Sequence, residues 1–155
     1  MRRTSFNSEW KFARYGLQAD GTRREEPTAL EAPTTSDADW QPIELPHDFA
    51  IAGPFRMDVA GNTGRLPYRG LGWYRKTFTP SAKDDGKRFF LDFDGVMANS
   101  KVWVNGQLAG GWPYGYSSFR IDLTPYLKIG QANVIAVRTD TEHWESRWYP
   151  GAGIY

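Results

Sequence analysis

The sequence predicts an all-β protein of the β-sandwich or jelly-roll class. Short segments of alternating apolar and polar residues recur along the chain, and Gly- or Pro-rich turns separate them. Helical signals are almost absent, because only Thr28–Ala32 and Ser36–Trp40 begin like helices and each is too short for more than a single turn. Short strands at close spacing with so little helix are typical of sandwiches and jelly rolls.

Two strands are expected in the middle of the chain. Residues 72–78 (GWYRKTF) form the first, and Pro80, which has no backbone N–H to donate, ends it. Residues 87–94 (KRFFLDFD) alternate with a period of two, which indicates a half-buried strand. The buried face of this second strand would carry Phe89, Leu91 and Phe93.

A hairpin and two more strands follow. Asn105-Gly106 lies between apolar runs, and both central residues of a type I′ turn need a positive φ, so this pair is a strong hairpin signal. We therefore expect residues 102–104 to pair with residues 107–109. Residues 119–123 alternate again, and the continuously apolar run Asn133–Val137 indicates a central strand.

Residues 16–39 and 46–71 are rich in Gly, Pro, Asp and Thr and are expected to be long surface loops. The length of 155 residues suits a single domain, residues 1–155. The last residues, Ile154 and Tyr155, resemble the start of another strand, whereas domains usually end in solvated residues. We therefore expect the natural chain to continue past Tyr155.

Composition and charge exclude several classes of protein. Lys and Arg number 19 against 18 Asp and Glu, and the signs are interleaved, so neither a nucleic acid nor a membrane is expected as a partner. The lack of cysteine excludes disulfides and cysteine-based zinc sites. No apolar run approaches the ~20 residues of a membrane span. No apolar segment typical of a signal peptide follows Met1–Arg3, and the compartment, cytoplasmic or exported, stays open.

Candidate catalytic groups are few. Asp92 and Asp94 would share one face of a strand, about 6.6 Å apart along the backbone, but the polar face of a sandwich strand explains them better. The two histidines, His47 and His143, have no partner at metal-ligand spacing, so no metal site is predicted. His47 follows Pro46 and is expected in a turn with a local hydrogen bond.

Aromatic residues are unusually common, with 7 Trp, 8 Tyr and 9 Phe. Trp10, Trp73 and Trp103 lie in strand patterns and are expected in the core. The groups at residues 112–116 and 144–149 lie in Gly/Pro-rich segments instead. Such rings either plug a core or stack on the apolar face of a sugar, and the sequence leaves both interpretations open.

Five motifs in this order resemble the N-terminal domain of glycoside hydrolase family 2 enzymes, from about Phe6 to Tyr155. They are LPHDF at 45–49, GWYRKTF at 72–78, FDGV with VWVNG between 93 and 106, FRIDLTPYL at 119–127 and SRWYPGAGIY at 146–155. The first and last motifs look most like the β-galactosidase branch of the family.

The resemblance implies a jelly-roll, galactose-binding-domain-like "sugar-binding" domain, followed by an immunoglobulin-like sandwich and a (β/α)₈ barrel. Because the catalytic glutamates of the family belong to the barrel, no catalytic residue is expected in this chain. Carried over by position, Arg147 is expected to contact the sugar, with Trp148 beside it; the alternative is an Arg147 that stacks on Trp148 and bonds to the backbone of this domain. Some relatives carry an acidic residue here that helps to hold a cation; this chain has Arg147, so no metal and no cofactor are expected.

The leading hypothesis is therefore the non-catalytic N-terminal domain of a retaining, β-galactosidase-like glycosidase. Its partners would be a carbohydrate and the remaining domains of the parent enzyme, whose homo-oligomerisation stays open. The alternative is a free-standing carbohydrate-binding module, which would need an exposed aromatic platform. A third reading, a complete small hydrolase that uses Asp92 and Asp94, is the weakest of the three.

Overall fold

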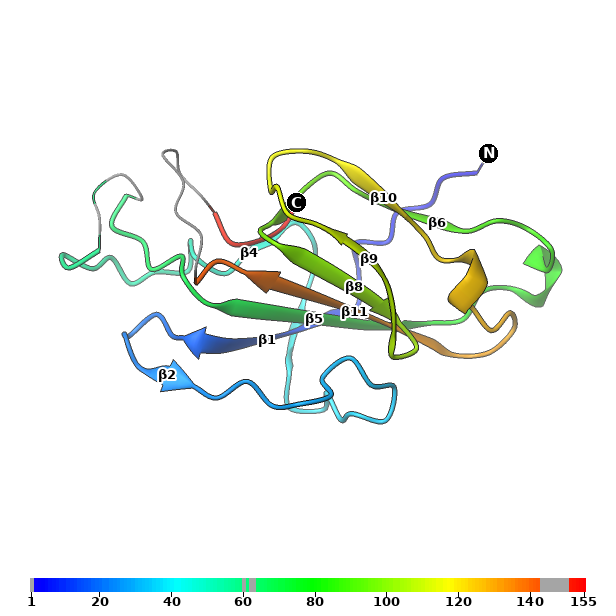
Figure 1. The fold of residues 1–155 in the computed structure, drawn as a ribbon, viewed down its shortest axis with the longest axis horizontal. Coiled ribbons are helices and arrows are strands. Elements are labelled where there is room, and N and C mark those ends of the chain that lie inside the picture. Colours follow the sequence, from blue (N-terminus) through cyan, green and yellow to red (C-terminus); the bar gives the residue numbers. More distant parts are fainter. Residues whose placement is uncertain (1, 60, 62–63, 143–150) are drawn as a thin grey trace.

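The computed structural model describes residues 2–59, 61, 64–142 and 151–155, and over these residues the chain is an all-β jelly-roll sandwich, as predicted (Figure 1). The 3₁₀ turns whose bounds lie within these residues are Ala82–Asp84 and Thr124–Tyr126, and no helix among the described residues is long and apolar enough to cross a membrane. The strands are β1 (Trp10–Leu17), β2 (Arg23–Arg24), β3 (Gln41–Ile43), β4 (His47–Asp48), β5 (Leu71–Phe78), β6 (Phe90–Phe93), β7 (Val96–Met97), β8 (Ser100–Val104), β9 (Gln107–Trp112), β10 (Phe119–Asp122), β11 (Asn133–Asp140) and β12 (Gly153–Ile154).

One layer is a seven-stranded antiparallel sheet in the order β2-β1-β5-β11-β8-β9, with β3 paired to β1. The predicted central strand lies within β11, between β5 and β8. Ile135, Ala136 and Val137 are all fully buried. The run is apolar without alternation because both faces of this part of the sheet are covered.

The second layer consists of two smaller sheets, β10-β6 and β4-β12-β7. The expected strands at 87–94 and 119–123 are confirmed as β6 and β10, which pair with each other and bury alternate residues. The main core lies between the two layers. It contains Trp10, Phe12, Tyr74, Val102, Val104, Ile135 and Val137 from the large sheet and Leu91, Phe93, Ile121 and Ile154 from the small ones.

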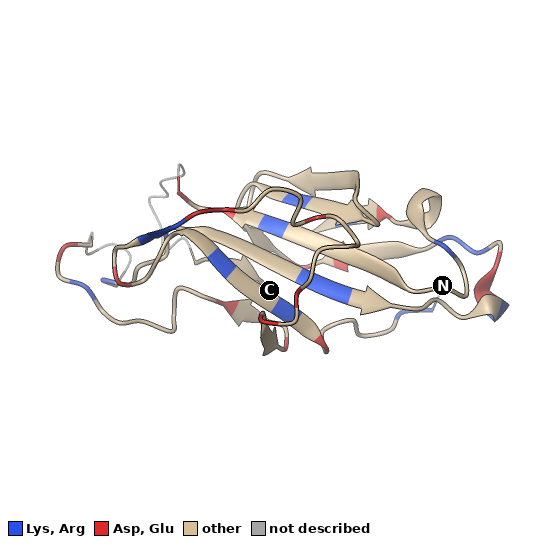
Figure 2. Cartoon of the chain, turned by 90° about the horizontal axis from the view of Figure 1, so that it is seen from below, with Lys and Arg blue, Asp and Glu red and all other residues tan. Residues whose placement is uncertain are grey.

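The outer face of the large sheet is covered by residues 18–40, which we call the strap. Leu30 and Trp40 of this segment are buried against Ala13, Tyr15, Leu71, Trp73 and Ala136, and Trp103 stacks on Trp73 with ring centroids 5.2 Å apart. Figure 2, drawn from below, shows Lys and Arg on several strands and the loops that cross in front of them. The strap thus buries Leu30 and Trp40 against the sheet, while its other residues are exposed or half-buried, as expected of a surface loop.

Arg75 of β5 fastens the strap to the sheet. Its side chain is only 1% exposed. The guanidinium donates to the carbonyls of Leu30, Ala32 and Thr35 at 2.5, 3.1 and 3.2 Å and pairs with Asp37 at 3.1 Å. Lys11 of β1 contacts the same carboxylate at 3.0 Å. The buried cation therefore has its acceptors on the strap alone.

The predicted hairpin is confirmed between β8 and β9, where Val104 pairs with Gln107. Asn105 and Gly106 have φ values of 52° and 81°, the positive values of a type I′ turn. The Asn105 side chain also accepts from the amide of Val134 at 3.0 Å and donates to the carbonyl of Tyr126 at 2.9 Å. The turn is thereby tied to the neighbouring strand.

Two expectations need correction. Residues 46–71 are not purely a surface loop, because Phe49, Ala50 and Tyr68 are buried in the main core. His47 is not in a turn but in β4, where it pairs with Ile154. The local hydrogen bond expected there is made instead by Asp48, which accepts from the amide of Ala50 at 2.8 Å.

We predict that Asn105→Ala lowers the free energy of unfolding by about 2–3 kcal/mol, because alanine is strained at positive φ and the side-chain hydrogen bonds are lost. Urea denaturation of the 155-residue chain measures the change. Asn99→Ala is the control, since Asn99 also has a positive φ (46°) but makes one long 3.3 Å hydrogen bond from an exposed position, and it should cost less. An unchanged midpoint for Asn105→Ala contradicts the assigned turn.

We also predict that Arg75→Lys destabilises the chain by roughly 3 kcal/mol, because an ammonium group lacks the planar fork that reaches four acceptors. Arg88→Lys is the matched control; Arg88 is exposed and makes one ion pair, with Asp122, so the change should stay within about 0.5 kcal/mol. Equal denaturation midpoints for the two variants would show that Arg75 does not fasten the strap.

Candidate functional site

The candidate site is the end of the sandwich at which the chain leaves β11 after Glu142 and returns at Gly151 (Figure 1). Arg147 and Trp148, the predicted sugar contacts, lie outside the described residues, so their role stays a prediction. His143 and the predicted aromatic group at residues 144–149 lie outside them too. The segments on either side are described, and they show how this end of the fold is built.

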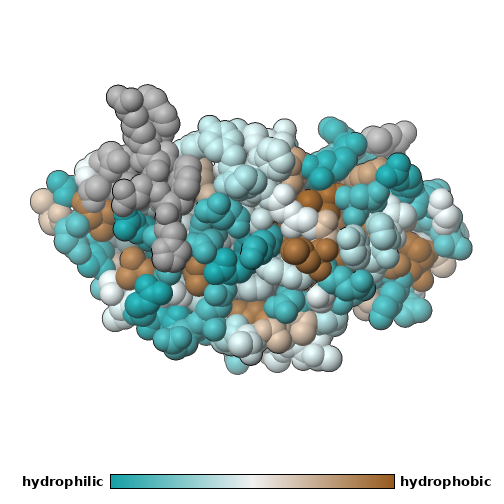
Figure 3. Space-filling view, viewed as in Figure 1, coloured by the Kyte–Doolittle hydropathy of each residue, from teal (hydrophilic) through white to brown (hydrophobic). Residues whose placement is uncertain are grey.

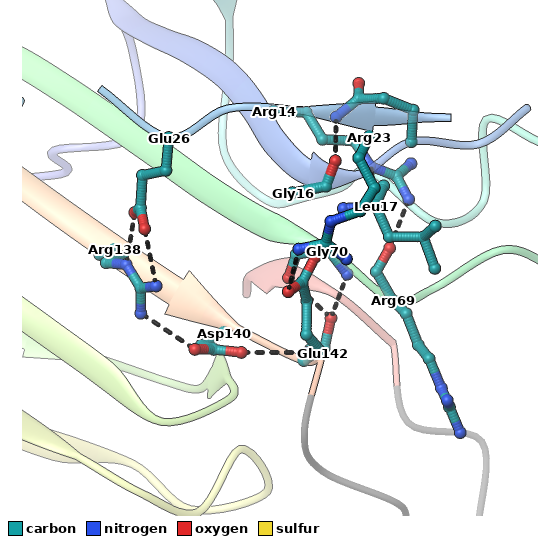
Figure 4. Close-up of polar contacts among 12 residues, drawn as sticks. Arg14, Gly16, Leu17, Arg23, Glu26, Arg69, Gly70, Arg138, Asp140 and Glu142 are labelled. Atoms are coloured by element: carbon teal, nitrogen blue, oxygen red, sulfur yellow. Dashed lines mark hydrogen bonds and ion pairs between the residues drawn. The ribbon is translucent and has the colours of Figure 1, made fainter. Parts of the chain in front are cut away.

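Glu142 anchors the upstream side (Figure 4). Its carboxylate accepts from the amide of Leu17 at 2.6 Å and pairs with Arg23 at 3.0 Å, while its own amide donates to Asp140 at 3.0 Å. Gly16 makes this possible: it has a φ of 64°, and a Cβ there would lie 2.1 Å from the Glu142 carboxylate. The end of β11 is therefore fixed to the end of β1.

A second group of charges links the strap to β11. Arg138 binds the two carboxylate oxygens of Glu26 at 2.6 and 3.1 Å and reaches Asp140 at 3.1 Å (Figure 4). The indole N–H of Trp73 donates to Glu26 at 2.6 Å. Burial raises the pKa of Glu26, but the hydrogen bonds from Arg138 and Trp73 outweigh it, so this pKa lies below its ordinary value. Glu26 thus acts as an ionised carboxylate that holds Arg138 and Trp73 in place.

Asp48 anchors the downstream side. One carboxylate oxygen accepts from the amides of Ala50 and Ala152, the latter at 3.2 Å, and the other accepts from the Tyr155 hydroxyl at 2.6 Å. β12 pairs with β4 on one side and β7 on the other. A Cβ on Gly153 would lie 1.9 Å from the carbonyl oxygen of His47, so the close pairing of β12 with β4 requires this glycine.

His47 belongs to β4 of this sheet, and its side chain packs against the core. Its Nδ1 lies 2.9 Å from the hydroxyl of Tyr74, and its ring packs on Phe12 with centroids 4.7 Å apart. Burial lowers the pKa of His47, and the nearby Asp48 only partly opposes this. A neutral imidazole packed in this way supports β4, and its Nδ1 is already occupied by the contact with the Tyr74 hydroxyl.

Arg14 fixes the third segment at this end, residues 67–70. It donates to the carbonyls of Pro67 and Arg69 at 3.0 and 2.6 Å and lies 4.9 Å from the ring centroid of Phe49. Burial lowers the pKa of Arg14 to about 10. The hydroxyl of Thr141, the residue after β11, lies 2.8 Å from the carbonyl oxygen of Tyr68 and 3.1 Å from that of Gly70, as a donor shared between them. The chain that leaves β11 therefore holds the same segment.

An open cavity of about 290 Å³ lies among these segments, lined by Arg23, Glu26, Arg138 and Glu142 among others. Its lining is polar, but the carboxylates of Glu26 and Glu142 are paired with Arg138 and Arg23. Arrays of this kind hold loops in place. The described residues contain no group of three or more His, Asp or Glu side chains that could hold a metal ion.

Asp92 lies elsewhere, at an exposed position of β6 in the small β10-β6 sheet, and Asp94 follows the end of β6. Arg120 of β10 binds Asp92 at 2.6 and 3.0 Å. These hydrogen bonds hold the pKa of Asp92 below its usual value. Asp92 therefore belongs to the polar face of a sandwich strand, which was the preferred interpretation, whereas Asp94 lies past the end of that strand.

Sequence reasoning missed Glu26, Glu142 and Asp48 as supporting residues. Two of them had a signal, because Asp48 belongs to the LPHDF motif and Glu142 comes directly before the predicted sugar-contacting segment. Glu26 had none, since its partner Arg138 is far away in the sequence.

Comparison with known proteins gives consistent matches. Residues 4–154 match the family model for the sugar-binding domain of the glycosyl hydrolases of family 2. The chain is 48% identical to a β-galactosidase of Bacteroides ovatus, over 99% of this chain and 17% of the relative. It is 32% identical to a β-glucuronidase of Formosa agariphila, over 97% of this chain and 16% of the relative.

Solved structures agree. A glycosyl hydrolase family 2 member from Bacteroides cellulosilyticus superposes with a TM-score of 0.87 at 36% identity, covering 100% of this chain and 20% of that one. A β-glycosidase from Bacteroides vulgatus gives 0.83 at 38% identity, covering 97% and 19%. This chain thus spans 16–20% of the length of these four relatives. The chain belongs to glycoside hydrolase family 2, as a sugar-binding domain of that family.

Proposed function

We propose that this chain is the non-catalytic N-terminal domain of a retaining, β-galactosidase-like glycosidase. In this role it braces the catalytic barrel of the full-length protein and contributes Arg147 and Trp148 to the sugar pocket. The similarity to a β-galactosidase at 48% identity supports the substrate class. The share of the relatives that this chain spans, 16–20%, leaves most of such a protein to carry the chemistry.

The observation that carries the proposal is the clamping of both flanks of residues 143–150. Glu142 is bonded to β1 and Arg23, and Ala152 and Tyr155 are bonded to Asp48. Fixing the two ends of a segment lowers the conformational entropy that its side chains lose when they bind a ligand. A guanidinium in such a segment offers five donors in a rigid plane, which suits sugar hydroxyls or a carboxylate of the barrel.

The electrostatics of three described carboxyl groups are consistent with a non-catalytic role for this domain. A retaining glycosidase needs two carboxyl groups about 5–5.5 Å apart, one of them an acid with a raised pKa. The pKa values of Glu26, Asp37 and Asp92 are lowered, each in a pair with Arg or Lys. Paired and ionised carboxylates stabilise the fold and do not protonate a leaving group.

The alternative is a free-standing carbohydrate-binding module. The exposed rings of Trp112, Tyr114 and Tyr116 favour it, because sugars stack on exposed aromatic side chains. Such a module binds sugar without the help of other domains. Titration calorimetry of the 155-residue chain with galactose and β-galactosides therefore separates the two functions. Saturable binding that Tyr114→Ala abolishes would support the module.

We predict that Arg147→Ala in the full-length protein lowers kcat/KM for an aryl β-galactoside by roughly tenfold, equal to about 1.4 kcal/mol of lost transition-state stabilisation. The melting temperature of the 155-residue chain should hardly move. Arg88→Ala, an exposed arginine on the N-terminal side of β6, is the matched control and should leave the kinetics unchanged. A loss of domain stability with normal kinetics would make Arg147 a packing residue.

We also predict that the 155-residue chain hydrolyses no aryl β-galactoside above background. In the full-length protein, Asp92→Asn should keep kcat within about twofold of the parent value, because its ion pair with Arg120 is exposed and contributes little. Stopped assays with purified variants measure both. A loss of kcat of about tenfold or more at unchanged stability would reinstate Asp92 as a catalytic group.

A further inference from the structure

Four exposed aromatic side chains, which we call the aromatic rim, lie at or near the C-terminal residue Tyr155. They are Trp112, Tyr114, Tyr116 and Tyr155, which are 45%, 52%, 48% and 42% exposed. Trp112 ends β9, and Tyr114 and Tyr116 lie in the connection between β9 and β10, which lies beside the C-terminal end in Figure 1. In Figure 3 the surface at the place of this connection has the pale colours of intermediate hydropathy.

Backbone contacts join these residues into one surface. The amide of Tyr155 donates to the carbonyl of Gly95 at 2.9 Å. A Cβ placed on Gly95 would lie 2.7 Å from the carbonyl oxygen of Gly115 and 3.9 Å from the ring of Tyr155. The connection and the end of the chain therefore touch the same glycine from two sides.

The rings are held in place before anything binds. The indole N–H of Trp112 donates to Ser117 at 2.8 Å, and the ring lies nearly parallel to that of Phe119, which packs against the core. The amide of Asn99 donates to the carbonyl of Pro113 at 3.1 Å. Gly115 lies against Met97 so closely that a Cβ would be 2.4 Å from its sulfur. A surface of fixed aromatic rings loses little entropy when it is covered.

The segments that form this surface lack charge. Residues 107–119 contain no Asp, Glu, Lys or Arg, although these make up 24% of the chain, and neither do residues 95–100 or 151–155. Depletion of charge together with enrichment in Tyr and Trp is the composition of the buried centre of a protein interface. The rim thus differs from the sheet face in Figure 2, where basic residues are frequent.

We propose that the aromatic rim is the docking surface for the polypeptide that follows Tyr155 in the full-length protein. Ile154 pairs with Val96 in an antiparallel register, so the next residues run past Gly95 toward the Tyr114–Tyr116 segment. This chain spans only 17% of its β-galactosidase relative. The inference rests on the proposed function, because it takes the remaining domains to follow this one, and it names the surface through which this domain braces them.

A sugar fits this surface less well. A sugar site needs polar groups placed around the ring that stacks. Here the Ser117 hydroxyl already accepts from Trp112, and the Tyr155 hydroxyl already donates to Asp48. Within residues 107–119 the one carboxamide or charged side chain is Gln107, which lies at the other end of β9.

Hydroxyl-radical footprinting tests the proposal, because it reports the solvent exposure of individual Trp and Tyr side chains. We expect the oxidation rates of Trp112, Tyr114 and Tyr116 to be roughly fivefold lower in the full-length protein than in the 155-residue chain, since an interface core excludes water. Leu108, which is 56% exposed on the same uncharged strand but away from Tyr155, is the internal control and should react equally in both. Tyr74, fully buried, gives the lower limit.

Tyr114→Ala provides a second readout, with Leu108→Ala as the matched control. We expect Tyr114→Ala to lower the melting temperature of the full-length protein by several degrees more than Leu108→Ala, and both to act alike in the 155-residue chain. Equal oxidation of the rim in the two proteins overturns the proposal. Rim protection of the 155-residue chain by added β-galactoside, or by raising its own concentration, also overturns it, in favour of a sugar site or a self-association surface. If the full-length protein proves inactive on glycosides while its rim is protected, the proposed function fails and the docking surface stands.

Discussion

The burial of the Arg75 guanidinium is the constraint on which the rest of this structure depends. An ion that is 1% exposed is tolerated only when its donors are satisfied, because an unpaired buried charge costs several kcal/mol. The acceptors are three backbone carbonyls and the Asp37 carboxylate, all on the strap. The strap therefore cannot leave the sheet without stranding a charge. Once it is in place, the middle of β11 is covered on both faces, and Ile135, Ala136 and Val137 can follow one another without alternation.

The same strap brings Glu26 to Arg138 and so connects the middle of the sheet with the loop end. From Arg138 the polar contacts continue to Asp140 and then to the amide of Glu142, whose carboxylate binds β1. The lowered pKa of Glu26 keeps this carboxylate ionised at neutral pH, so the pairing with Arg138 persists there. The geometry of the candidate site is thus set by contacts between distant parts of the sequence.

This dependence explains which features could be predicted from the sequence. Period-two alternation at residues 87–94 and the Asn105-Gly106 turn are local signals, and β6 and the β8–β9 hairpin followed them. The burial of Leu30 and the fastening of the strap by Arg75 had no local signal, because the partners of Arg75 are mostly backbone carbonyls, which no residue type reveals. The sequence did not decide whether the rings of residues 112–116 are buried or exposed, for a related reason. The segment that carries them is held by the packing of Gly115 on Met97, which is a contact between distant segments.

The contacts that clamp this end of the sandwich tolerate changes of side chain at the residues whose amides they bind. Glu142 binds the amide of Leu17, and Asp48 binds those of Ala50 and Ala152, so the clamps rest largely on backbone groups outside residues 143–150. The clamps use backbone amides as donors, so they can persist through changes of side chain at Leu17, Ala50 and Ala152, whereas the loss of the Arg75–Asp37 contact would disturb the sheet that carries them.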